Sequence, residues 1–400
     1  MTTTLRHDQY GSDDATRLPD AAHPFDDATR IPSDRRFMSI RQTSDATLTP
    51  AYTPMSAPAE SPLPQLEDDD SVITLSSVST PPPDNDISWF QRSFAALTTN
   101  IANAVLDKTM AIRLCVTALI AGGHLLIEDV PGTGKTQLAR SLARSVHAPC
   151  RRIQFTPDLL PSDVTGTTVY DQHQGTFSFR QGPVFSSIVL ADEINRASPK
   201  TQSALLEVME EGTVTAAGVT YEVPKPFMVI ATQNPIEQTG TYRLPEAQLD
   251  RFIIATSIGH PGRQAGLAIL KHPGTACRSD AVRPVCHGDD ILSLRGVAAH
   301  IRMDDMVAEY VMRIVEATRV DDAVAFGASM RGALALARCA QVWAAAEGRS
   351  YVVPDDVKTL SPATLAHRIV LTSEASFRGM TGLRVIERIV EDVPPPTLGP

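Results

Sequence analysis

One stretch of the chain constrains its fold more than any other. Residues 124–146 read HLLIEDVPGTGKTQLARSLARSV. The short apolar run predicts a buried strand, a loop with two glycines follows, and the spacing of Leu and Ala after the loop predicts a helix. This is the setting of a phosphate-binding P-loop, whose usual pattern is Gly, four residues, then Gly-Lys-Ser or Gly-Lys-Thr. Asp129 stands where that pattern has its first glycine.

The loop carries the groups that a polyphosphate requires. Backbone N–H groups and a helix N-terminus converge on phosphates, and Gly132 and Gly134 permit the close approach. Lys135 is expected to neutralise the β- and γ-phosphates, and Thr136 to bind Mg²⁺. Because Asp129 precedes these amides and Pro131 restrains the backbone, an outward-pointing carboxylate is expected to cost little. The predicted nucleotide-binding residues are Asp129, Val130, Pro131, Gly132, Thr133, Gly134, Lys135, Thr136 and Gln137.

Two carboxylates follow a second predicted core strand, in the stretch SSIVLADEINR. The carboxyl end of a strand is where α/β sheets bind ligands. Asp192 is expected to hold Mg²⁺ through water, and Glu193 to orient and deprotonate the attacking water. Asn234 ends the next core strand, where it is placed to contact the γ-phosphate or that water. The pairing of the loop with these acids predicts hydrolysis of a nucleoside triphosphate.

Composition separates a tail from the body. Residues 1–86 are rich in Pro, Ser, Thr and Asp and hold −9 of the net charge of −10, so we expect a disordered acidic tail. The nearly neutral body has no basic field that would indicate nucleic-acid binding. Within the tail, DDATRLP recurs as DDATRIP. This repeat is either a drifting duplication or a short linear motif phosphorylated at Thr16 and Thr29.

The remaining patterns predict an α/β domain followed by helices. Two helices are expected after Ile87, hairpins near Gly175 and Gly218, and a helix that Ser198 caps. The expected domains are 87–260 (α/β, parallel sheet), 261–392 (helical) and 393–400 (tail). The five scattered cysteines, the lack of an apolar leader and the lack of a membrane-length apolar run indicate the cytoplasm. The spacing of His272, Cys277, Cys286 and His287 matches no usual zinc site.

Several long motifs give the chain a family resemblance. It resembles the MoxR family of AAA+ ATPases from about residue 104 to 372, in HLLIEDVPGTGKT, RRIQFTPDLLPSDVTG, DEINRASPKTQSALLEVMEE, ATQNPIEQTGTYRLPEAQLDRF and GASMRGALALARCA. Glu-Asp-Val-Pro-Gly is common in that family, so the loop is a variant and not a damaged site. The resemblance implies an AAA+ core with hairpin inserts and a helical lid, and a homo-oligomeric ring, expected as a hexamer. It also implies a von Willebrand A-domain partner and a client protein that the sequence does not name.

The resemblance also implies roles for single residues. Asn234 matches sensor 1, Arg251 matches an arginine finger that completes a neighbouring subunit's site, and Arg331 matches sensor 2, which reports γ-phosphate to the lid. Two positions depart from the family. Met330 replaces the usual Pro, which is expected to loosen that helix start, and Asp107-Lys108 replaces Gly-Gln near the adenine. A DNA-directed AAA+ motor and a non-hydrolysing nucleotide-gated scaffold are the alternative functions.

Overall fold

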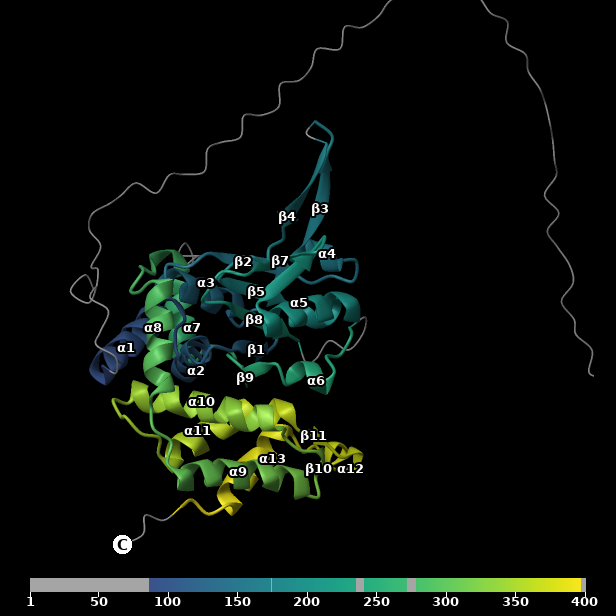
Figure 1. Cartoon of the computed structure of the whole chain (residues 1–400). Coiled ribbons are helices and arrows are strands. Elements are labelled where there is room, and N and C mark those ends of the chain that lie inside the picture. Colours follow the sequence, from purple (N-terminus) through teal and green to yellow (C-terminus); the bar gives the residue numbers. More distant parts are fainter. Residues whose placement is uncertain (1–85, 174, 235–240, 272–277, 397–400) are drawn as a thin grey trace, which may run out of the picture. The chain divides into compact units, whose positions relative to one another are not determined.

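The computed structural model describes residues 86–173, 175–234, 241–271 and 278–396. The predicted tail lies outside these residues except for Asp86, and so do both copies of the repeat, His272 and Cys277. A parallel five-stranded sheet with the order β2-β5-β8-β1-β9 forms the centre of the described part (Figure 1). Its strands are β1 (His124–Glu128), β2 (Cys150–Gln154), β5 (Ile188–Asp192), β8 (Met228–Gln233) and β9 (Phe252–Thr256).

The three inner strands of the sheet, β5, β8 and β1, are buried on both faces, as their apolar sequences predict. Alternate side chains of β1 enter different clusters, with Leu125 and Ile127 on one face and Leu126 on the other. Since successive residues of a strand point to opposite faces, both faces must be covered. The pairing places β8 between β5 and β1, with Leu190 beside Ile230.

Thirteen α-helices lie within the described residues. They are α1 (Ile87–Ala104), α2 (Thr109–Ile120), α3 (Lys135–Ser145), α4 (Pro161–Thr165), α5 (Pro199–Glu211), α6 (Glu246–Leu249), α7 (Arg263–Lys271), α8 (Gly288–Ala299), α9 (Asp305–Val320), α10 (Met330–Ala346), α11 (Pro354–Leu365), α12 (Ser373–Phe377) and α13 (Gly382–Asp392). The two helices expected after Ile87 are confirmed, and so is the helix capped by Ser198. Ser198 Oγ accepts a hydrogen bond from Thr201 N, and Gly212 ends α5 at φ +68°. The prediction did not include the antiparallel pair β10 (Val324–Phe326) and β11 (Val370–Leu371).

Both predicted hairpins are present. One pairs β3 (Gly166–Asp171) with β4 (Thr176–Gln181), and the other pairs β6 (Thr213–Ala216) with β7 (Val219–Glu222). Ala217 and Gly218 both have positive φ, as a two-residue turn of the β6–β7 kind requires. The rings of Phe179 and Tyr221 stack at 4.7 Å between centroids, so the two hairpins contact each other.

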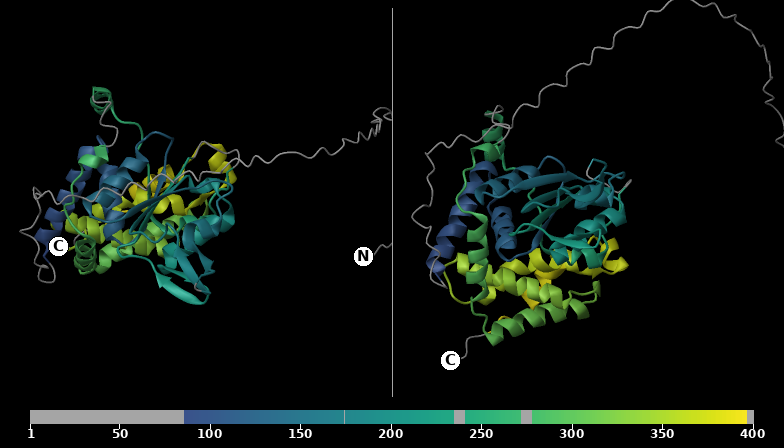
Figure 2. Two further views of the ribbon diagram at one scale, coloured as in Figure 1. Left: turned by 90° about the horizontal axis from the view of Figure 1, so that it is seen from above. Right: turned by 45° about the horizontal axis from the view of Figure 1, so that its top comes forward.

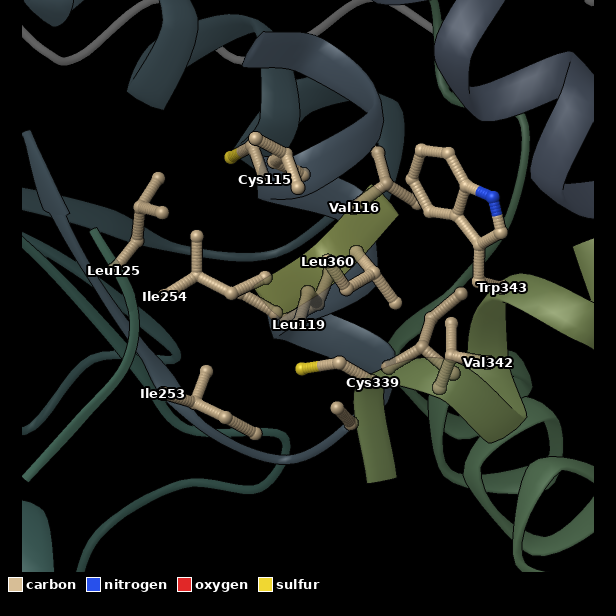
Figure 3. Close-up of a cluster of buried hydrophobic side chains, with 14 of the residues drawn as sticks. Cys115, Val116, Leu119, Leu125, Ile253, Ile254, Cys339, Val342, Trp343 and Leu360 are labelled. Atoms are coloured by element: carbon tan, nitrogen blue, oxygen red, sulfur yellow. The ribbon is translucent and has the colours of Figure 1, made fainter. Parts of the chain in front are cut away.

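The helices α9 to α13, light green to yellow, form one group in Figures 1 and 2. Apolar side chains of α9, α10, α11 and α13 join those of α2, β1 and β9 in one continuous cluster. Figure 3 shows the part of it that α10 and α11 contribute. In that cluster Cys339 and Trp343 of α10 and Leu360 of α11 lie with Ile253 and Leu119. The helical segment and the sheet are therefore packed around one shared core.

A buried ion pair joins the same two regions. Arg368, whose side chain is only 2% exposed, donates from Nε to Asp250 Oδ1 at 2.7 Å. Its other nitrogens donate to backbone carbonyls, including that of Phe252 at 2.7 Å in β9. A buried guanidinium needs partners for all its N–H groups, and these contacts supply them.

Candidate functional site

The loop between β1 and α3 is shaped by its two glycines. Gly132 has φ +85° and Gly134 has φ +98°, values that side chains rarely tolerate. A Cβ atom at either position would meet nothing within 4 Å, so the backbone conformation, and not crowding, requires glycine. No side chain caps α3, which begins at Lys135, so its first N–H groups remain available to an anion.

Lys135 lies folded against the loop itself. Its Nζ donates to the carbonyl oxygens of Asp129 at 2.8 Å and Val130 at 3.2 Å. Thr133 Oγ1 donates to the Val130 carbonyl at 3.3 Å, while Thr136 is half-buried one residue into the helix. The ammonium group is therefore at the loop mouth, where it can exchange carbonyl oxygens for phosphate oxygens.

The expectation of an outward carboxylate at Asp129 is wrong. Asp129 is buried, with 7% exposure, and its carboxylate accepts three backbone hydrogen bonds. Oδ1 accepts from Val130 N at 2.9 Å, and Oδ2 accepts from Ile258 N at 2.9 Å and Gly259 N at 2.6 Å. The side chain faces the segment after β9 because those amides have no strand partner there and require an acceptor. Asp129 thus fastens the loop to residues 258–259 and does not face the phosphate position.

The two unusual residues near the predicted adenine position contact the same segment. Asp107, at φ +60°, accepts from Gly262 N at 3.1 Å, and Lys108 Nζ donates to the His260 carbonyl at 2.6 Å. The turn between α1 and α2 is therefore fixed to the chain that leaves β9.

The acid pair lies at the carboxyl end of β5. Asp192 Oδ1 accepts from Thr232 Oγ1 at 2.6 Å, and the same hydroxyl accepts from Glu193 N at 3.0 Å. Arg152 donates to Asp192 Oδ2 from Nη2 at 2.5 Å and from Nε at 3.1 Å. Glu193, at φ +57°, accepts at Oε2 from Gln154 Nε2 at 3.0 Å.

Sequence reasoning missed three of these partners, and it also missed Arg196, whose Nε lies 3.0 Å from Glu193 Oε2. Arg152 and Gln154 come from RRIQF, a stretch that contains no predicted site residue. The missed signal is the strand period of two, which places residues 152 and 154 on one face of β2 beside β5. Thr232 was hidden inside an apolar run of β8.

The structure brings most of the predicted residues to one edge of the sheet. β8 pairs with both β5 and β1, so the acid pair and Lys135 are separated by one strand, about 10 Å across the sheet. Asn234 is buried and follows β8, between them. This edge therefore carries a lysine, two carboxylates, an amide and an open helix N-terminus.

Arg251 and Arg331 lie at the opposite edge. Both pair with Glu210, Arg251 Nη2 at 2.8 Å from Oε2 and Arg331 Nη2 at 2.6 Å from Oε1. They line a pocket with His124, which is the first residue of β1. The phosphate-binding loop instead follows the last residue of that strand. Five strand residues, about 16 Å, separate the two ends. Within one chain, neither arginine is at the Lys135 edge.

The start of α10 is capped despite Met330. Ser329 is its N-cap residue and donates from Oγ to Asp250 Oδ2 at 2.9 Å. Its Oγ also accepts from Gly332 N at 3.4 Å. The loosening expected from the missing Pro is opposed by this cap.

The donor set at the Lys135 edge fits a magnesium–nucleotide complex. Mg²⁺ usually takes one or two protein oxygens together with phosphate oxygens, and Thr136 and Asp192 supply such oxygens. Among the described residues there is no group of three or more His, Cys, Asp or Glu side chains placed to hold a metal. Cys286 and His287 belong to this searched set, and burial raises the pKa of the Cys286 thiol to about 12. In the same part of the chain, no helix is long and apolar enough to cross a membrane.

Comparison with known proteins agrees with this geometry. The family described as "ATPase family associated with various cellular activities (AAA)" matches residues 124–254, and the AAA lid domain matches residues 316–391. A crystal structure of a candidate ATPase from Cytophaga hutchinsonii has a TM-score of 0.73 at 36% identity. It covers 78% of this chain and 97% of that one.

Sequence relatives are similar over most of their length. The uncharacterized protein YeaC of Bacillus subtilis is 48% identical over 297 residues, which is 74% of this chain and 93% of the relative. Chaperone MoxR1 of Mycobacterium tuberculosis is 39% identical, covering 73% and 80%, and protein MoxR of Methylorubrum extorquens is 30% identical, covering 79% and 98%. With its parallel AAA+ sheet and helical lid, the chain belongs to the MoxR family of AAA+ ATPases.

Proposed function

We propose that this chain is a Mg²⁺-dependent ATPase whose turnover drives remodelling or maturation of a client protein. One observation carries the proposal: three neighbouring strands deliver Lys135, the acid pair Asp192–Glu193 and Asn234 to the same edge of the sheet, beside an uncapped helix. A protein that only binds a nucleotide needs the phosphate-binding loop, but it does not need a second carboxylate such as Glu193 next to the proposed metal ligand Asp192.

Each residue has a defined task in this proposal. Lys135 and the loop amides bind the β- and γ-phosphates, and the γ-phosphate replaces the carbonyl oxygens that Lys135 now contacts. Thr136 and Asp192 hold Mg²⁺, which would neutralise charge on those phosphates. Glu193 takes a proton from the attacking water, and Asn234 orients that water. Gln154 and Arg196 hold Glu193 at its carboxylate before reaction.

Arg251 and Arg331 complete the site of a neighbouring copy. Their pairing with Glu210, at the edge away from Lys135, supports a role between subunits for both. A ring satisfies this requirement, because each copy then supplies two arginines to the next. We propose a hexameric homo-oligomer in the cytoplasm, with a von Willebrand A-domain protein as partner.

The chaperone-like part of the proposal is supported by the relatives. One relative is named a chaperone, and two others carry the name MoxR. A client caught by a Glu193→Gln variant in the presence of ATP, and released by the wild type, would test this role.

The test of ring catalysis is subunit mixing. Arg251→Ala and Glu193→Gln should each be inactive alone in a phosphate-release assay while still binding ATP. A mixture should recover part of the activity, because some interfaces then join an intact Glu193 site to an intact Arg251. Energy transfer between labelled subunits confirms that exchange occurs. Exchange without recovered activity would refute catalysis across the interface, and salt-dependent stimulation by DNA would favour a DNA motor instead.

A further inference from the structure

A cation from the chain itself already occupies the carboxylate assigned to magnesium. Arg152 donates twice to Asp192 Oδ2, with Nη2 at 2.5 Å and Nε at 3.1 Å. The Asp192 side chain is only 11% exposed. A carboxylate this buried is costly without a positive partner, and Arg152 supplies one.

Arg152 is much more exposed than the buried arginine that joins the sheet to the helical segment. Its side chain is 47% exposed, and its hydrogen bonds go to the side chains of Asp192 and Gln154. Arg368 provides the contrast, since its side chain is 2% exposed and donates to several backbone carbonyls. A half-exposed guanidinium regains water when it moves away, so its displacement is cheap compared with that of a buried one.

We propose that Arg152 is a positioning residue that stands in for the divalent cation at Asp192 and competes with it. The inference rests on the proposed function and names a residue that tunes its metal dependence. Both hydrogen bonds from Arg152 to Asp192 go to Oδ2, so the guanidinium lies where a water of the magnesium shell would have to donate to Asp192. Binding of the hydrated metal at this carboxylate would therefore break the Arg152 contact. The pair therefore compensates the charge of Asp192 and lowers the affinity for the metal–nucleotide complex.

The contact also reaches the water-activating residue. Arg152 Nη2 donates to Gln154 Oε1 at 2.6 Å, which fixes the amide so that Nε2 faces Glu193 Oε2. When Arg152 leaves Asp192, this amide loses the donor that orients it. Binding of the metal at Asp192 would thereby weaken the hydrogen bond from Gln154 that positions Glu193.

The test measures how much magnesium improves nucleotide binding. Isothermal titration calorimetry gives the dissociation constant of AMPPNP for the full chain, once with excess Mg²⁺ and once with EDTA. The dissociation constant in EDTA divided by the dissociation constant in Mg²⁺ is the metal enhancement. In Arg152→Met the enhancement should rise about fivefold or more, because the competing cation is gone and Asp192 repels the metal-free triphosphate.

Matched variants separate this effect from charge removal. Arg151→Met deletes a positive charge from the other face of β2 and should leave the enhancement unchanged. Arg152→Lys should lie nearer the wild type, and Arg152→Met should have no effect in an Asp192→Asn background. Should Arg152→Met not fold, Arg152→Gln carries the same expectation.

The outcomes are distinguishable. An enhancement in Arg152→Met equal to or below that of the wild type would overturn the inference while leaving the proposed ATPase intact. A wild-type chain that binds no AMPPNP would overturn the proposed function itself, and the inference with it. A rise in both Arg152→Met and Arg151→Met would show a general charge effect and would also overturn the specific role of Arg152.

Discussion

Restoring the usual glycine of the P-loop should damage this protein. In Asp129→Gly the carboxylate that accepts from Val130 N, Ile258 N and Gly259 N is lost. A buried amide deprived of a charged acceptor costs about 1.5 to 3 kcal/mol, and two of the three amides are distant in sequence. Glycine itself costs about a further 0.5 to 1 kcal/mol, because it loses more backbone freedom on folding than aspartate does. With some rescue by water, we expect a loss of about 3 to 5 kcal/mol.

Urea unfolding followed by circular dichroism measures this loss directly. Asp129→Asn keeps one acceptor oxygen and should lose about half as much, while Glu207→Ala, which removes an exposed carboxylate on α5, should stay within about 0.5 kcal/mol. Binding of AMPPNP should weaken in Asp129→Gly because the loop loses its fastening to residues 258–259. The reasoning is refuted if Asp129→Gly matches the wild type in both stability and affinity.

Three further expectations can be checked with standard assays. Glu193→Gln should bind ATP yet barely release phosphate, because only water activation is lost, whereas Lys135→Ala should lose binding itself; near-normal turnover in Glu193→Gln would contradict the assignment of the base. Burial lowers the pKa of His124 to about 4 and of His367 to about 3 in the folded chain, below the unfolded value near 6.5. The neutral forms are therefore favoured by folding, and this stability is present above about pH 6.5 and is lost as pH falls towards those values. Urea unfolding at pH 7 and pH 5 should show a loss of about 2 kcal/mol for each histidine, and a flat profile would contradict it. Removing every residue before Asp86 should leave the ATPase rate within roughly twofold. Removing Asp86 as well should cost about 1 kcal/mol, because its carboxylate caps α1, and equal stability of the two truncations would exclude that role.

Local patterns were enough to predict the framework of the site. The strand, loop and helix around Lys135 follow from residue type and spacing, and so does the strand that delivers Asp192 and Glu193. The two strands are short and strongly apolar, and the helix has a regular apolar face, so local preference and tertiary packing agree. The caps of α5 were predictable for the same reason, since Ser198 and Gly212 act within one helical turn.

Contacts between distant segments could not be predicted in this way. The acceptor role of Asp129 depends on amides about 130 residues later, and a loop pattern contains no information about them. Arg152 is hidden in a pair of basic residues, and only the pairing of β2 with β5 shows which of the two faces Asp192. The short pair β10–β11 has too few residues to give a strand pattern.

The core shared by the sheet and the C-terminal helices has a mechanical consequence. Bending the chain between β9 and α10 would separate Ile253 from Cys339 and break the bonds of Arg368 to β9. Close-packed interiors transmit displacement instead of absorbing it, so we expect these regions to move together as one rigid unit. In the proposed ring, the conformational change driven by ATP would then be a rotation of whole subunits relative to their neighbours. Fluorophores on β9 and α10 of one chain should keep their distance through the cycle, while fluorophores on neighbouring chains should not.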